Sequence, residues 1–198
     1  QRRGGCTAKR TFLIRDTEIP VSISVGIATS DLDGGPGALL RDADTAMYGA
    51  KDAGRDSVLV FDNSMRDRVS NRLELERDLR HALDRDELAV HFQPVVDMVN
   101  SRTLGFEALM RWTRRLGGAM SPSIFIPAAE RSGLIDDLGM FALRRAVEEI
   151  GPLENLKVSV NVSGMQLRNP GLATSIRAVL DEWQMPAGRL QLEVTESF

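Results

Sequence analysis

Polar side chains recur on one face of four segments that alternate like β-strands. The segment GFEALMRW places Glu107 and Arg111 on one side, where an all-apolar face would be cheaper to bury. KVSVNVSG places Asn161 opposite a face of valines, and RLQLEVTES places Glu193 opposite a similar apolar face. AVHFQPVV carries Gln93 in the same way. Strands of a covered parallel sheet usually run nearly apolar throughout, so this pattern indicates a site.

The side chains on these faces are suited to binding a divalent cation. An isolated buried carboxylate costs several kcal/mol, so Glu107 and Glu193 need a partner, solvent or a cation. Together with Asn161 they would form an all-oxygen site, which suits Mg²⁺ or Mn²⁺ better than zinc. Arg111 would then bind a phosphate beside the metal. A structural Glu–Arg pair inside a barrel is the alternative, and the lone His91 is interpreted as structural.

The elements that must position these residues alternate between strand and helix. Helical spacing of apolar residues predicts helices in DLGMFALRRAVEEIG and GLATSIRAVLDEWQ, each followed by one of the strands that carry a polar face. Such an order is typical of parallel βα units, and a leading pair of strands completes part of a barrel. We therefore expect an α/β fold with a partial (β/α)8 TIM-like barrel, whose chemistry lies at the carboxyl ends of the strands.

The first part of the chain predicts a smaller unit. PVSISVGIA alternates cleanly and is expected to be a half-buried strand whose valines and isoleucines face the core. A helix is predicted in ALLRDADTAMYGAKDAG, and SVLVF follows as a short strand. The polar stretch DNSMRDRVSN lacks apolar periodicity and is expected to connect two domains.

Composition excludes few functions. The net charge of −3 gives no general attraction to DNA, RNA or an anionic membrane. The single cysteine, Cys6, cannot form an internal disulfide, which fits a reducing compartment. No apolar run is long enough to span a membrane, and no signal peptide is recognised, so we expect a cytoplasmic location. Both ends of the sequence look cut from something longer.

Five motifs resemble those of the EAL domain, a family of cyclic di-GMP phosphodiesterases. They occur in the family's order and spacing, as FQPVVD, GFEALMRW, FIPAAERSGLI, VSVNVSGMQLRNP and LEVTES. VSISVGIA and LLRDADTAMYGAKDAGRD resemble the end of a GGDEF, or diguanylate cyclase, domain. The resemblance implies the C-terminal part of a GGDEF domain at residues 1–61, a linker at 62–71 and the N-terminal half of an EAL domain at 72–198. The GGDEF part would be the remnant of an α+β domain.

The resemblance also implies roles for particular residues. Glu107, Asn161 and Glu193 would bind a pair of Mg²⁺ or Mn²⁺ ions, and the remaining ligands would lie outside this chain. Glu107 would thus be catalytic, as would Glu196, which would hold the following loop for metal binding and dimerisation. The substrate-binding residues would be Gln93, Leu109 and Arg111.

The implied activity is metal-dependent hydrolysis of cyclic di-GMP to linear pGpG in bacterial signalling. Cyclic di-GMP would be the ligand, and a homodimer would form through the EAL domain. The chain alone is expected to be incomplete and inactive. The first alternative is a catalytically inactive receptor that binds cyclic di-GMP and signals through a partner. The second is a structural fragment without a working site.

Overall fold

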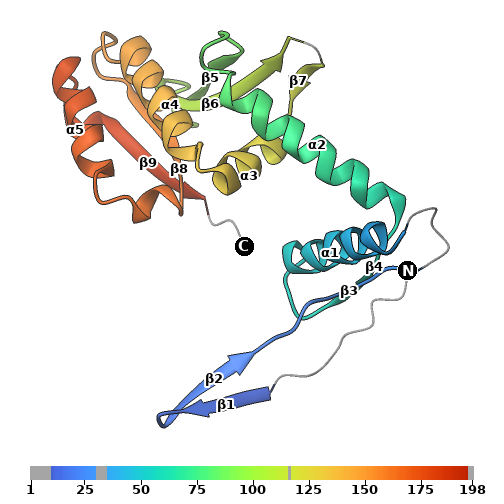
Figure 1. Ribbon diagram of the computed structural model, residues 1–198. Coiled ribbons are helices and arrows are strands. Elements are labelled where there is room, and N and C mark those ends of the chain that lie inside the picture. Colours follow the sequence, from blue (N-terminus) through green and yellow to red (C-terminus); the bar gives the residue numbers. More distant parts are fainter. Residues whose placement is uncertain (1–9, 30–34, 116, 196–198) are drawn as a thin grey trace. The chain divides into compact units, whose positions relative to one another are not determined.

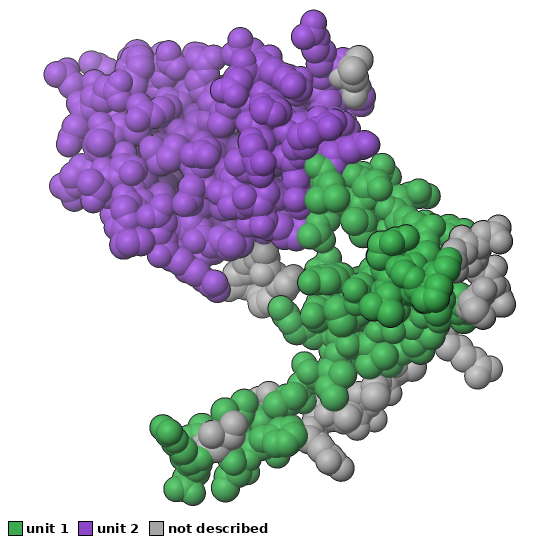
Figure 2. All heavy atoms as spheres, viewed as in Figure 1, with its two compact units in different colours: residues 1–73 green, residues 74–198 purple. Residues whose placement is uncertain are grey.

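The chain forms two compact units, which span residues 1–73 and 74–198 (Figure 2). The computed structural model describes residues 10–29, 35–115 and 117–195. Cys6, Glu196 and most of the predicted turn DLDGGPG lie outside these residues. Within them, no helix combines the length and the apolar character that crossing a bilayer requires.

The first unit consists of a hairpin and a small βαβ arrangement. Strands β1 (Arg10–Ile14) and β2 (Thr17–Val21) pair antiparallel through a two-residue turn. Both turn residues have positive φ, as in the tight turns that match strand twist. Strands β3 (Val25–Ile27) and β4 (Val58–Val60) pair in parallel and are joined through helix α1 (Pro36–Asp52) (Figure 1).

The prediction of one half-buried strand in PVSISVGIA is wrong, both in the length of the strand and in the face that is buried. The segment is split between β2 and β3, and Ile23, Val25 and Ile27 are 53%, 36% and 42% exposed. Helix α1 packs against the opposite face, where a Cβ on Gly26 would lie 2.0 Å from the carbonyl oxygen of Ala43. The glycine therefore determines the covered face, because only a residue without a Cβ allows this approach.

The polar stretch predicted as a linker is helical. Helix α2 runs continuously over Asn63–Arg80 and so includes nearly all of residues 62–71. Its first half is mostly exposed, whereas Leu79 near its end is fully buried. The division of the chain into two compact units falls within this helix, between residues 73 and 74.

The second unit contains a mixed sheet with strand order β5-β6-β8-β9 (Figure 1). Strand β5 and the short β7 pair antiparallel with β6, whereas β6, β8 and β9 are parallel. The elements are β5 (Leu88–Val96), β6 (Thr103–Arg114), β7 (Gly118–Met120), α3 (Pro122–Ser132), α4 (Ile135–Ile150), β8 (Lys157–Ser163), the 3₁₀ turn η1 (Gln166–Arg168), α5 (Leu172–Glu182), the 3₁₀ turn η2 (Ala187–Arg189) and β9 (Leu190–Thr195).

Two apolar clusters hold this sheet in place. In the first, Val158 and Val160 of β8 pack against α4 and α5, which cover one face of the sheet (Figure 1). In the second, Trp112 at the end of β6 meets Phe125 of α3 edge-on, with ring centroids 5.7 Å apart. The helical layer on one face and the parallel β6-β8-β9 order confirm the mixed α/β prediction and give a partial barrel.

Candidate active site

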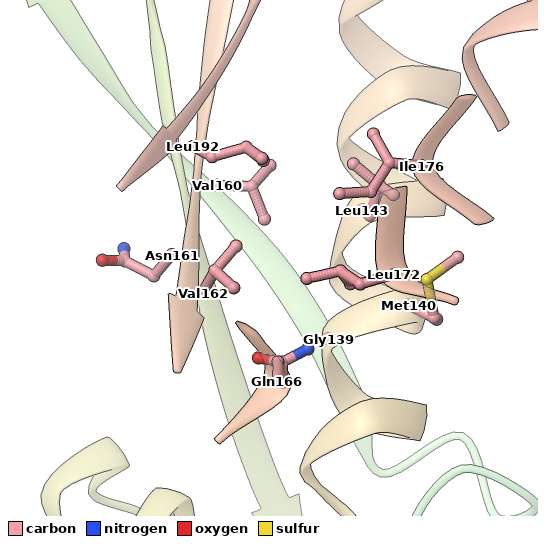
Figure 3. Close-up of a pocket in the computed structure, with 10 residues that line it drawn as sticks. All are labelled: Gly139, Met140, Leu143, Val160, Asn161, Val162, Gln166, Leu172, Ile176 and Leu192. Carbon is pink, nitrogen blue, oxygen red and sulfur yellow. The ribbon is translucent and has the colours of Figure 1, made fainter. Parts of the chain in front are cut away.

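The alternation of β8 separates an apolar face from a polar one. Val160, Val162 and Leu192 line a narrow apolar cavity between the sheet and the helices, whereas the carboxamide of Asn161 points away from it (Figure 3). That cavity belongs to the core. The candidate chemistry therefore lies on the opposite face of the sheet.

Strand register brings the predicted residues onto that polar face. Gln93 of β5 is the register partner of Glu107 on β6, and Asn161 of β8 is the partner of Glu193 on β9. Glu107 pairs with Ser159, two residues before Asn161 on the same face of β8. Register partners project to the same side of a sheet, so these side chains form one continuous polar strip.

Glu107 and Asn161 are in direct contact. The Nδ2 amide of Asn161 donates to Oε1 of Glu107 at 2.9 Å, and both side chains are partly exposed. This bond fixes the carboxamide so that its Oδ1 oxygen remains available to a ligand. The carboxylate of Glu193, also partly exposed, is on the neighbouring strand.

The donors on this face are of the type that hard divalent cations prefer. They are two carboxylates and an amide oxygen, and neither histidine nor cysteine is needed. Among the described residues, no group of three or more His, Cys, Asp or Glu is arranged to hold a metal. The strip thus fits Mg²⁺ or Mn²⁺ in kind of donor but supplies only part of a coordination shell.

Arg111 does not pair with Glu107. Their Cα atoms are separated by about 13 Å along the strand, and the salt bridges of the described residues do not join the two side chains. Nη1 of Arg111 instead donates to the carbonyl oxygen of Met110 at 2.9 Å. The alternative of a structural Glu–Arg pair is therefore wrong, and the guanidinium keeps donors for another ligand.

Leu109 and His91 complete the middle of the strip. Leu109 is partly buried between Glu107 and Arg111 on β6, and it is the register partner of His91 on β5. His91 is exposed. The structure therefore places Gln93, Leu109 and Arg111 on the same face as the acidic residues, whereas Glu196 lies outside the described residues.

Sequence reasoning missed a second polar cluster, at the end of β8. The hydroxyl of Ser163 donates to Oε1 of Glu130 on α3 at 2.5 Å, and the backbone amide of Ser163 donates to Oε1 of Gln166 at 3.0 Å. Glu130 and Ser163 are 33 residues apart. The signal in the sequence was a glutamate within the motif FIPAAERSGLI, and the motif alone does not tell which strand this glutamate reaches.

Comparison with known proteins identifies the second unit. The model of the EAL domain family matches residues 76–198. Over 192 residues the chain is 38% identical to the bifunctional diguanylate cyclase/cyclic di-GMP phosphodiesterase MucR of Pseudomonas aeruginosa, and the match covers 94% of this chain and 28% of MucR. It is also 38% identical over 191 residues to the cyclic di-GMP phosphodiesterase PdeR of Escherichia coli, which covers 94% of this chain and 29% of PdeR. The chain thus spans less than a third of the length of these curated relatives.

A solved structure agrees with this match. The MucR phosphodiesterase of P. aeruginosa, in complex with c-di-GMP, superimposes with a TM-score of 0.58 at 37% identity, over 63% of this chain and 52% of that one. The likeness is therefore one of fold as well as of sequence. From the family match over residues 76–198, together with this likeness in sequence and fold, we conclude that the chain belongs to the EAL domain family.

Proposed function

We propose that this chain is part of a metal-dependent phosphodiesterase that hydrolyses cyclic di-GMP to linear pGpG. The observation that carries the proposal is the bond of 2.9 Å between Asn161 and Glu107, beside Glu193 in register, on the polar face of an EAL-family sheet. The similarity to MucR and PdeR, both of which are named as cyclic di-GMP phosphodiesterases, supports the choice of substrate.

In this proposal Glu107, Asn161 and Glu193 hold Mg²⁺ or Mn²⁺ in a two-metal site. The oxygen donors on the polar strip support the choice of a hard cation. When bound, such ions lower the pKa of a water and offset negative charge on the phosphoryl oxygens. Further ligands are needed, because two carboxylates and one amide do not fill the shell of either ion.

The remaining residues of the strip bind and orient the substrate. Arg111, whose guanidinium is not paired with Glu107, binds a phosphate of the cyclic dinucleotide. Gln93 is exposed beside Glu107 and forms a hydrogen bond with the same ligand. Leu109, between Glu107 and Arg111 on β6, supplies an apolar contact to it. We assign Glu196 the role of holding the following loop in place for metal binding and dimerisation.

The proposal extends to the organisation of the whole protein. Residues 1–61 would be the C-terminal part of a GGDEF domain, residues 62–71 the connection and residues 72–198 the N-terminal half of the EAL domain. The match to MucR over 94% of this chain supports this organisation, because a match of that extent includes most of the first unit. We further propose cyclic di-GMP as the ligand and a homodimer formed through the EAL domain.

The test is an assay of cyclic di-GMP hydrolysis by the intact protein with Mg²⁺ or Mn²⁺. We expect pGpG to form in the wild type and its rate to fall by about a hundredfold or more in Glu107→Gln, which keeps the size of the side chain but removes its charge. Glu149→Gln, on the exposed side of α4, is the matched control. Equal rates in both variants would refute the role of Glu107. Binding of cyclic di-GMP without hydrolysis in the wild type would favour an inactive receptor instead.

A further inference from the structure

We propose that Glu130 is a positioning residue that fixes the end of β8 and, through it, the Asn161 side chain of the metal site. This inference rests on the proposed function and deepens it, since it adds a residue from helix α3 to a site otherwise built from strands. Its basis is the cluster of hydrogen bonds around Ser163.

Ser163 is anchored through its hydroxyl and through its backbone amide. The hydroxyl donates to Glu130 at 2.5 Å and accepts from the backbone amide of Met165 at 3.1 Å. The backbone amide of Ser163 donates to Gln166 at 3.0 Å. Ser163 and Gln166 are only 6% and 3% exposed, so water competes little with these bonds. Hydrogen bonds thus link Ser163, the last residue of β8, to the turn that follows it and to helix α3.

Gln166 is held from its other side by close packing. A Cβ on Gly139 of α4 would lie 2.0 Å from Nε2 of Gln166, so the side chain fits against the bare backbone of the helix. Two helices therefore define where the turn after β8 lies, α4 by close contact and α3 by a hydrogen bond from Ser163.

The geometry links this cluster to the proposed metal ligand. Ser163 and Asn161 lie on the same face of β8, about 6.6 Å apart along the strand. Glu130 forms no salt bridge with any arginine, lysine or histidine in the described part of the chain, so its charge is met by a hydroxyl. Glu130 therefore acts on Asn161 through the backbone of β8, one step further removed than residues that hydrogen-bond a metal ligand directly.

Two substitutions separate the reach of Glu130 from its charge. Glu130→Asp keeps the charge but shortens the side chain by one methylene, so it loses the bond to Ser163. Glu130→Gln keeps the length and an accepting oxygen. Glu149→Asp on the exposed side of α4 is the control. The readouts are amide hydrogen exchange of Ser163 and Met165, and Mn²⁺ binding by calorimetry, both in the intact protein without nucleotide.

We expect Glu130→Asp to raise both exchange rates, and the Kd for Mn²⁺, by about tenfold or more. Glu130→Gln should stay within about threefold of the wild type in both measurements. The inference is overturned if Glu130→Asp behaves like the Glu149→Asp control. It is also overturned if exchange rises while Mn²⁺ affinity is unchanged, because Glu130 would then be structural only. If wild-type protein neither binds Mn²⁺ nor hydrolyses cyclic di-GMP, the proposed function itself fails, before any variant is made.

Discussion

Replacing Arg189 should destabilise the second unit by removing the hydrogen bonds that attach the start of β9 to the segment before β8. Its guanidinium donates to four backbone carbonyl oxygens at 2.7 to 3.0 Å, those of Ile150, Gly151, Leu153 and Leu156. These carbonyls belong to the end of α4 and to the loop that leads into β8. Because Arg189 immediately precedes β9, the bonds also help to keep Glu193 beside Asn161.

The size of the effect follows from the burial of these bonds. Three of the four are partly buried and one is exposed. At about 1 kcal/mol for each partly buried bond, Arg189→Ala should lower the free energy of unfolding by about 3 kcal/mol. Arg189→Lys should recover only part of this loss, because an ammonium group cannot reproduce the planar fork of donors.

Urea unfolding followed by tryptophan fluorescence measures this change in the second unit alone. Both tryptophans of the chain, Trp112 and Trp183, lie in residues 74–198. Arg177→Ala, an exposed arginine on α5, is the matched control and should shift the midpoint little. If Arg189→Ala lowers the free energy of unfolding no more than Arg177→Ala does, the four hydrogen bonds do not stabilise the attachment of β9.

Two further outcomes are expected. Gly105→Ala should destabilise the second unit by several kcal/mol in the same urea assay, because the new Cβ would lie 2.2 Å from the carbonyl oxygen of Lys157 and force β6 and β8 apart; an unchanged midpoint would contradict the observed register. The Val99 amide and, after it, the Asn100 side chain hold the pKa of the exposed Asp97 carboxyl below its ordinary value of 3.8. The stability that the ionised Asp97 carboxyl contributes to its turn should therefore be fully present above pH 3.8 and be lost as the pH falls through the lower pKa of the folded state. An NMR titration that gives Asp97 a pKa of 3.8 or more would refute this.

Alternation along each strand was sufficient to predict the polar face of the second unit. The apolar side chains of β8 lie in the core and Asn161 points the other way, as a period of two residues requires (Figure 3). The same rule failed in the first unit, where Val25 and Ile27 are exposed and α1 packs against Gly26. Periodicity shows that two faces differ, but it does not tell which face a neighbouring helix will cover.

By itself, the sequence determined the alternation of strands and helices in the second unit, the kind of side chain on each of its strand faces and the family to which the motifs point. Only the tertiary structure decided which residues meet. Glu107 contacts Asn161, which lies 54 residues further along the sequence. Arg111 does not pair with Glu107, and Glu130 of helix α3 accepts a hydrogen bond from Ser163 of β8. The physical reason is that strand register and helix placement depend on contacts between distant segments, such as the close approach of Gly105 to Lys157, which no local pattern encodes.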